Sequence, residues 1–227
     1  MKKITLSIIF LFLFNTNSLG HLQHYSSVNL LEYELYRNND LIGFHKYLFS
    51  KKDQKLIVDS EVSFKITKLG IDLYKYYAKS EEIYENNKFK LFTSKTLQNK
   101  KEKYVNINVD KSLNKLKIDG SSFKGDTDIN YMVGTWWNHE IVKAKAQISA
   151  ISGRIIYQNV EFLGKKKINL YGKDYEALHF KFLSSDKTLP DNKKLNTDIW
   201  YDAKSLIWLK AQFVKQGNWE YRLKKYN

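Results

Sequence analysis

The sequence predicts a mainly β protein, with about ten to eleven strands in a large curled antiparallel sheet or open barrel and one short helix after residue 135. Alternation of apolar and polar residues with a period of two recurs along most of the chain. Turn-forming Asn, Asp, Gly and Ser separate these segments. Apolar residues reach 43% and aromatic residues 15%, so the chain can cover one face of such a sheet, and intrinsic disorder is excluded.

The first 20 residues have the layout of a secretory signal peptide. Residues 1–3 are basic, residues 4–14 are an apolar run, and residues 15–20 are small and polar, which places cleavage after Gly20. An uncleaved anchor is the alternative, but its apolar run is shorter than the roughly 20 residues that span a bilayer. We therefore expect an exported protein, periplasmic or secreted, with one antiparallel β domain over residues 21–227.

The first half of the mature chain is expected to form successive strands joined by short turns. The clearest strand covers residues 55–68, with apolar residues on one parity and charged or hydroxyl residues on the other. Further strands are predicted over residues 29–36, 42–48, 71–82, 89–97, 104–109 and 113–120. Residues 120–130 are small and polar and predict a long loop or an internal boundary.

The segment from Thr135 to Ser149 differs, because Ile141, Ala144 and Ile148 recur every three to four residues. It is the helix candidate, with Thr135 or Asn138 as its N-cap. Strands return after Gly153 and are predicted over residues 155–162, 166–171, 176–183, 198–202, 207–214 and 219–223. Long alternating strands bury one face only, as in antiparallel sheets.

The chain is basic, with 38 Lys and Arg against 24 Asp and Glu and a formal net charge of +14. The lysines are scattered in short clusters between apolar segments, whereas nucleic-acid-binding proteins gather such charge on one face. We interpret them as turn and edge-strand lysines, which discourage aggregation of sheets, and expect no nucleic-acid partner. An anionic membrane surface would attract the same charge, so peripheral membrane contact remains an open expectation.

Motifs for catalysis and metal binding are missing from the sequence. Cysteine is absent, and the five histidines form no metal-binding pattern, because Lys143 stands where a second histidine would follow His139–Glu140. Residues 126–130 begin like a calcium loop, but Tyr131 replaces the required glycine. We expect no catalytic residue, no metal and no cofactor, and an enzyme without a recognisable signature is the third-ranked hypothesis.

The candidate ligand-binding residues are aromatic. Trp136, Trp137 and Asn138 precede the predicted helix, and Trp200 lies on a predicted strand. Indoles with polar neighbours can line an apolar pocket or cover its mouth. The alternative is that one of these tryptophans fills the concave face of the sheet as ordinary core. Trp200 and Tyr201 face opposite ways by parity, so at most one of them lines the interior.

Several short motifs resemble an exported bacterial family of unknown function. The segment from Tyr33 to Gly43 is similar to the family's opening, in which Y-x-V-x-x-x-G-x-x-I-G leads a long series of strands. The other similar pieces are Glu82-Ile83-Tyr84 followed by Phe89, Trp137-Asn138, Ser152-Gly153, Gly172 with Ala177, and residues 198–202. The resemblance spans about residues 30–225. His139 departs from it, because proline is expected there.

That family in turn resembles the LolA/LolB-like periplasmic lipoprotein carriers, which hold acyl chains against a curled sheet. The resemblance implies a non-catalytic protein that binds a lipid or another apolar ligand in the concave face. It transfers no binding residue. The competing hypothesis is an envelope protein-protein interaction or scaffold module, with a core filled by its own aromatic residues and another protein as its partner. A dry hollow lined by Trp and Phe would favour the carrier, and a packed interior would favour the module.

Overall fold

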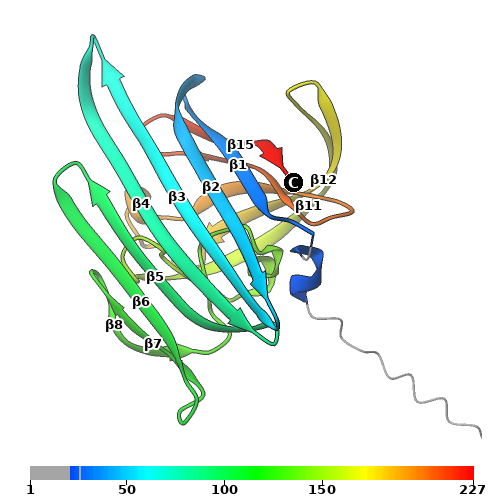
Figure 1. The fold of residues 1–227 in the computed structure, drawn as a ribbon. Helices are drawn as coiled ribbons and strands as arrows, with labels where there is room; N and C mark the ends of the chain where they lie inside the picture. Colours follow the sequence, from blue (N-terminus) through cyan, green and yellow to red (C-terminus); the bar gives the residue numbers. More distant parts are fainter. Residues whose placement is uncertain (1–20, 26) are drawn as a thin grey trace, which may run out of the picture.

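The computed structural model describes residues 21–25 and 27–227, in which one sheet of 15 strands contains nearly all the regular structure (Figure 1). The predicted signal peptide, residues 1–20, lies outside the described residues. The strands of the first half are β1 (Leu30–Arg37), β2 (Asp40–Lys52), β3 (Lys55–Lys68), β4 (Ile71–Glu85), β5 (Lys88–Gln98), β6 (Lys101–Asp110), β7 (Lys115–Gly120) and β8 (Lys124–Asp128).

The second half of the chain completes the sheet. Its strands are β9 (Met132–Val133), β10 (Ala146–Ile148), β11 (Ile155–Leu170), β12 (Lys173–Ser184), β13 (Asn196–Asp202), β14 (Trp208–Val214) and β15 (Asn218–Tyr226). The described helices are short 3-10 turns: η1 (His21–Tyr25), η2 (His139–Lys143) and η3 (Asp191–Lys193). No helix of the described part is long and apolar enough to cross a membrane.

The strand order follows the chain except at one place. It runs from β8 back to β1, continues from β1 to β15, and then runs back to β9. Each neighbouring pair is antiparallel apart from β9 and β10, which are parallel. The first and last strands therefore meet in the middle of the sheet, in a register from Leu31↔Tyr226 to Arg37↔Trp219.

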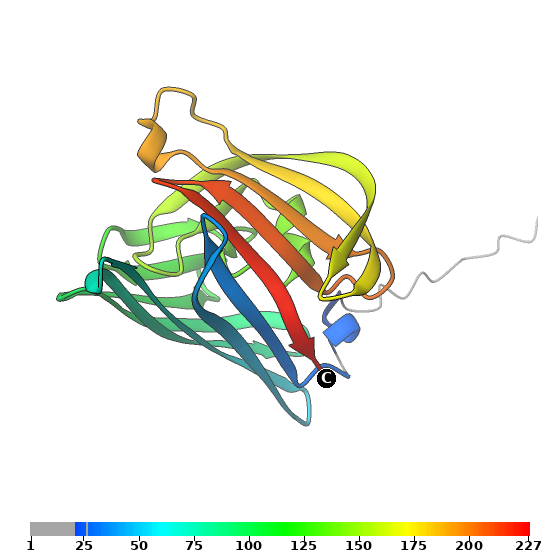
Figure 2. The ribbon, with the colours of Figure 1, turned by 90° about the horizontal axis from the view of Figure 1, so that it is seen from above.

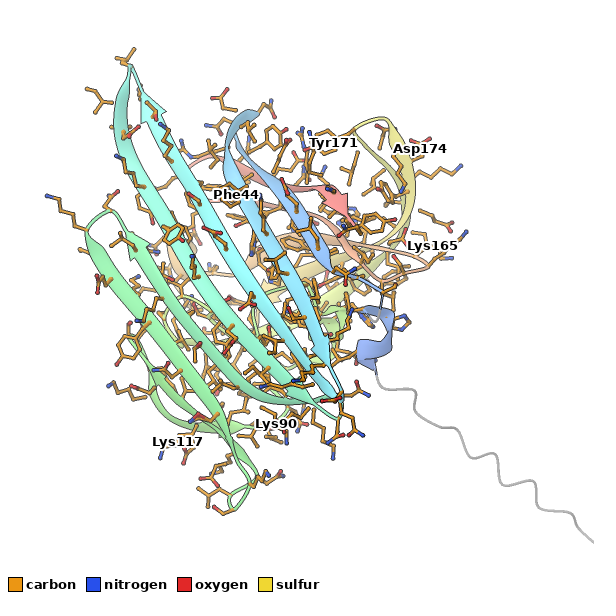
Figure 3. The ribbon with its side chains drawn as sticks, in the orientation of Figure 1. Phe44, Lys90, Lys117, Lys165, Tyr171 and Asp174 are labelled. Carbon is orange, nitrogen blue, oxygen red and sulfur yellow. The ribbon has the colours of Figure 1, made fainter. Side chains whose placement is uncertain are left out.

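The sheet curls so that its two halves face each other around a shared interior (Figure 2). Residues 129–154 connect the halves and lie against the inner face, where Ser94 Oγ donates a hydrogen bond to the Ala150 carbonyl at 2.6 Å. On the outer face, the β11–β12 hairpin is tied to β1 by Tyr171, whose hydroxyl donates to Glu34 Oε2 at 2.5 Å (Figure 3).

Alternation along the strands divides the side chains into an inner and an outer face. On β3, for example, Leu56 and Val58 are buried and Asp59 is exposed. The larger apolar cluster surrounds Trp137 and Trp208. A smaller cluster lies where β5, β6 and β7 pack against residues 131–155.

The predicted fold class is confirmed, with two corrections. The sheet has 15 strands rather than ten to eleven, partly because residues 124–128, predicted as loop, form β8 through main-chain pairing with β7. The helix after residue 135 is a five-residue 3-10 turn, and residues 146–148 form β10 instead of extending it. Pairing of Ala146 with Tyr157 in β11 prevails over the helical spacing of this segment.

Candidate functional site

The adjacent residues Trp136 and Trp137 have different environments. Trp137 is fully buried, and its indole N–H donates to Glu82 Oε2 at 2.9 Å. Its ring meets Tyr25 edge-on, with 5.0 Å between the ring centroids, and it also meets Phe49 and Tyr84. Trp137 is therefore part of the core that closes one end of the inner face.

Three tyrosines hold the backbone at this position. The hydroxyl groups of Tyr47, Tyr201 and Tyr25 donate to the consecutive carbonyls of residues 135, 136 and 137, respectively. These tyrosines come from β2, β13 and η1, which are far apart in the sequence. Burial raises the pKa of each of the three phenols, so each stays a donor at neutral pH. We call this arrangement the tyrosine clamp.

Trp136 adopts a backbone conformation that is unusual for a bulky residue. Its φ angle is +60°, in the left-handed region that favours glycine. The tyrosine clamp stabilises this conformation through the three carbonyls. The Trp136 ring is half-buried and meets Trp208 at 5.6 Å and Tyr221 at 6.1 Å between ring centroids. Its indole nitrogen is buried without a hydrogen-bond partner among the described residues.

Half-buried aromatic rings continue from Trp136 towards the turn between β3 and β4. Successive members are in ring contact, from Tyr221 through Phe213 and Trp219 to Phe64. Phe64 is in turn stacked on Tyr76, with 4.8 Å between ring centroids, and meets Tyr74. We call this part of the inner face the open half, defined by Phe64, Tyr74, Tyr76, Trp136, Phe213, Trp219 and Tyr221. We call the part around Trp137 the sealed half.

Gly43 allows the open half to form. This glycine lies on β2, opposite Phe64 of β3. A Cβ at Gly43 would lie 2.5 Å from the Phe64 Cβ and 2.1 Å from the Ser63 carbonyl oxygen. Such distances leave no room for a side chain at position 43. Because Gly43 has none, the Phe64 ring can lie across β2 and contact Trp219 on β15, although β2 and β1 lie between β3 and β15.

His45 lies at the boundary between the two halves. Its ring centroid is 4.3 Å from that of Tyr47, 6.2 Å from that of Trp208 and 6.0 Å from that of Tyr221. Its Nε2 is hydrogen-bonded to Ser60 Oγ at 2.9 Å, whereas its buried Nδ1 has no partner among the described residues. Burial lowers the pKa of His45 to about 3, so the ring is neutral at physiological pH.

Glu82 is the buried acid of the sealed half. Besides Trp137, the hydroxyl of Tyr84 and the Thr135 hydroxyl donate hydrogen bonds to its carboxyl group, the last at 3.3 Å. Burial raises the pKa of Glu82, and these hydrogen bonds oppose the shift. Glu81 points to the outer face, as strand alternation requires. Two neighbouring carboxylates are thus kept apart and form no acid-base pair.

The structure brings three of the four predicted site residues together. Asn138 follows the two tryptophans and is the N-cap of η2, where its side-chain oxygen accepts a hydrogen bond from the Glu140 amide at 3.1 Å. Trp200 is not brought to them. It lies on the outer face of β13, stacked on His179 at 4.3 Å and covered by Lys210. Tyr201, with the opposite parity, reaches the interior instead.

Two hollows of the described part are grooves with mainly polar side chains along the outer face. One of about 610 Å³ crosses β2 to β6 and is lined mainly by charged and hydroxyl side chains, including Lys46, Glu61 and Lys95. The other, of about 400 Å³, lies near the β14–β15 turn and includes Lys181, Asp198 and Glu220. In the described part of the chain, no group of three or more His, Asp or Glu could hold a metal ion.

Sequence reasoning missed the tyrosine clamp, His45 and Glu82. Each of these residues except Tyr25 lies on the inner face of a predicted strand, but apolar alternation could not have found those on β2 and β4. On these strands the apolar residues Leu48, Ile71 and Leu73 are exposed, so the pattern favours the opposite face. Their convergence depends on which strands face each other across the interior, and the local pattern does not contain that information.

The fold and the inner face define an open, barrel-like antiparallel sheet with an aromatic interior. Residues 33–224 match a domain of unknown function, DUF6134, and the chain belongs to that family. This membership confirms the expected relation to a family of unknown function. No curated protein matches the chain.

One solved structure shows a similar fold in another family of unknown function. A beta-barrel-like protein of the domain of unknown function DUF1849 from Brucella abortus is similar, with a TM-score of 0.59 and 12% sequence identity over 87% of this chain and 95% of that chain. A DUF1329 family protein from Desulfovibrio piger covers 91% of this chain and 88% of its own, at 9% identity. Its TM-score of 0.19 is too low to bear on the fold.

Proposed function

We propose that this chain is an exported, non-catalytic protein of the cell envelope, periplasmic or secreted, whose open half binds a lipid or another apolar ligand. The observation that carries the proposal is Trp136. Three tyrosines hold this residue in a left-handed conformation, and its half-buried ring lies where the sealed core ends. Strained residues that the surrounding structure holds in place are frequent at ligand-binding sites.

The open half offers apolar contact area together with polar groups that fix orientation. Its aromatic side chains are half-buried and so remain within reach of a ligand. The Trp136 and His45 rings both lie next to Trp208 and Tyr221, and the Trp136 indole N–H and His45 Nδ1 lack hydrogen-bond partners among the described residues. An amphipathic ligand with a hydrogen-bond acceptor would satisfy the Trp136 indole N–H, since apolar sites commonly orient ligands with a few polar groups.

The resemblance to LolA/LolB-like carriers supports the same proposal at the level of the fold. A fold hosts many functions, so the residues of the open half carry more weight than the resemblance. The predicted signal peptide supports the export part of the proposal.

Displacement of a fluorescent naphthylamine probe by fatty acid tests this function. Trp136→Gly removes the indole and keeps a backbone that adopts positive φ freely. We expect it to weaken binding about tenfold, which corresponds to roughly 1.4 kcal/mol. Trp136→Phe, which keeps a ring but lacks the N–H, should lose less.

The control is Trp200→Phe, which changes an indole that faces away from the open half, keeps an aromatic ring at this buried position and should leave binding unchanged. Failure of the parent protein to bind the probe would refute the proposal. An equal loss in the Trp200 and Trp136 variants would show that the probe binds away from the open half.

A second candidate, an interaction or scaffold module, is favoured by the packing of the sealed half. Trp137, Trp208, Tyr33 and Tyr47 are buried with at most 1% exposure, and the two grooves lie on the outer face. A filled core and polar outer grooves suit protein contacts better than lipid storage. Mass spectrometry of material that co-purifies with the natively exported protein separates the candidates, since the first requires a lipid and the second a protein.

A further inference from the structure

The hairpin formed by β3 and β4 extends beyond both neighbouring strands. On one side, β2 pairs with β3 no further than Gly43↔Phe64, and on the other, β5 pairs with β4 no further than Gln98↔Tyr76. Residues 65–74 consequently pair only within this hairpin, up to Lys68↔Ile71, whereas the Lys75 main chain is still hydrogen-bonded to Asn99 at the β5–β6 turn. Figure 1 shows this tip projecting past the adjacent hairpins. We call residues 65–75 the β3–β4 tip.

The end of this tip is apolar and exposed. Leu69 is 92% exposed, Ile71 is 66% exposed and Leu73 is 56% exposed. Single exposed apolar residues are ordinary on protein surfaces, but three within five residues at a projecting turn form a contiguous patch. Leu69 and Gly70 both have positive φ angles, of 52° and 77°, and form a tight turn from which the Leu69 side chain projects into solvent.

Basic residues surround the patch. Lys65, Lys68 and Lys75 lie on the tip and are exposed. The single acid of the tip, Asp72, is bridged by Lys75 at 3.0 Å and approached by Lys65 at 4.0 Å. The tip thus has an excess of positive charge immediately behind its apolar end.

Other turns at the same end of the sheet add to this surface. Antiparallel pairing places the β1–β2, β5–β6 and β14–β15 turns at the end where the β3–β4 tip lies. Leu41, Leu97 and Val214 beside these turns are 58%, 41% and 78% exposed. Lys100 and Lys101 lie at the β5–β6 turn and add positive charge near the tip.

We propose that the β3–β4 tip docks onto an anionic lipid bilayer, with Leu69, Ile71 and Leu73 entering the interfacial layer and the lysines contacting lipid head groups. The tip is convex, so it fits a soft surface that it can penetrate better than it fits a preformed protein pocket. Its ring of lysines is complementary to negatively charged head groups. Apolar burial and electrostatic attraction act together in binding of this kind. This inference is independent of ligand binding in the open half.

Co-sedimentation with vesicles tests the docking. The parent protein should sediment with vesicles made of equal parts phosphatidylglycerol and phosphatidylcholine, and much less with phosphatidylcholine alone. The double variant L69D/I71D should lower the partition coefficient at least tenfold. The double variant K65Q/K68Q should lower it severalfold at low salt and have little further effect in 1 M salt, where charges are screened beyond about 3 Å.

The control is Leu113→Asp, in the β6–β7 turn at the opposite end of the sheet. Leu113 is 55% exposed and lies between Lys111 and Lys115, so it matches the chemistry of the tip without its position. Its replacement should change partitioning less than twofold. Circular dichroism of each variant checks folding, and Leu69→Ser is the milder replacement if the double variant does not fold.

Three outcomes overturn the proposal. In the first, the parent protein fails to sediment with anionic vesicles, and in the second, Leu113→Asp reduces binding as strongly as L69D/I71D. In the third, the parent protein is a dimer which L69D/I71D dissociates, because a second copy of the chain would then cover the tip.

Discussion

The sealed and open halves of the inner face are both built mainly from aromatic residues. They differ in how deeply their rings are buried and in whether their polar atoms have hydrogen-bond partners. In the sealed half, the Trp137 indole is bonded to Glu82 and has no exposed surface. In the open half, the Trp136 indole has no hydrogen-bond partner among the described residues and its ring is half-buried. The difference teaches that the boundary between the closed core and the half-buried aromatic surface, for which we propose ligand binding, falls between two adjacent tryptophans.

The largest expected effect is the loss of the Trp137 ring. Trp137→Ala should lower the free energy of unfolding by about 3–5 kcal/mol, because it opens a core cavity and also removes a donor from the buried Glu82. Trp136→Gly should cost less than half as much, since its ring is half-buried and glycine tolerates the backbone conformation. Urea unfolding of both variants measures the difference. Equal losses would mean that the two halves form one continuous core.

Titration of His45 should give the next largest effect. Its pKa is lowered to about 3 by burial, so the unfolded chain takes up a proton near pH 6.5 while the folded chain stays neutral. Stability should therefore fall as the pH falls from about 6.5 towards 3, by up to about 4 kcal/mol from this group. His45→Gln should flatten the dependence of the unfolding free energy on pH in that window. An unchanged slope would show that the ring gains a proton in the folded state.

The smallest effect is expected at the outer end of the open half. Tyr74→Ala removes a half-buried ring that rests on Phe64 at 6.0 Å and should cost about 1 kcal/mol. The urea midpoint measures this change, and the slope of the transition should stay constant. A loss comparable to that of Trp137→Ala would place Tyr74 in the core and contradict the division into two halves.

Much of the fold could be predicted because alternation is a local property. The strand expected over residues 55–68 has the bounds of β3, and the opposite orientations of Trp200 and Tyr201 follow from parity alone. Residues 124–128 were predicted as loop because an edge strand depends on main-chain pairing and needs no apolar side chains. The short η2 turn and β10 were predicted as one helix because spacing alone cannot register pairing with β11.

Less of the candidate site could be predicted. Trp136, Trp137 and Asn138 are adjacent in the sequence, so their proximity is trivial, whereas Trp200 is buried in the same large apolar cluster but makes no ring contact with the two tryptophans among the described residues. The clamp on the carbonyls of residues 135–137 comes from Tyr25, Tyr47 and Tyr201, which meet only after the sheet has curled. Whether a tryptophan belongs to the core or to a binding surface is decided by those distant contacts.

The pairing of β1 with β15 has a consequence for the order of folding. Residues 31–37 find one of their two neighbouring strands within the next few residues, but the other consists of residues 219–226, at the very end of the chain. During synthesis β1 therefore lacks one of its two neighbouring strands until β15, almost 190 residues later, has been made. Long-range closure of this kind is slow. Removal of residues 218–226, which constitute β15, would leave β1 and β14 each without a neighbouring strand on that side.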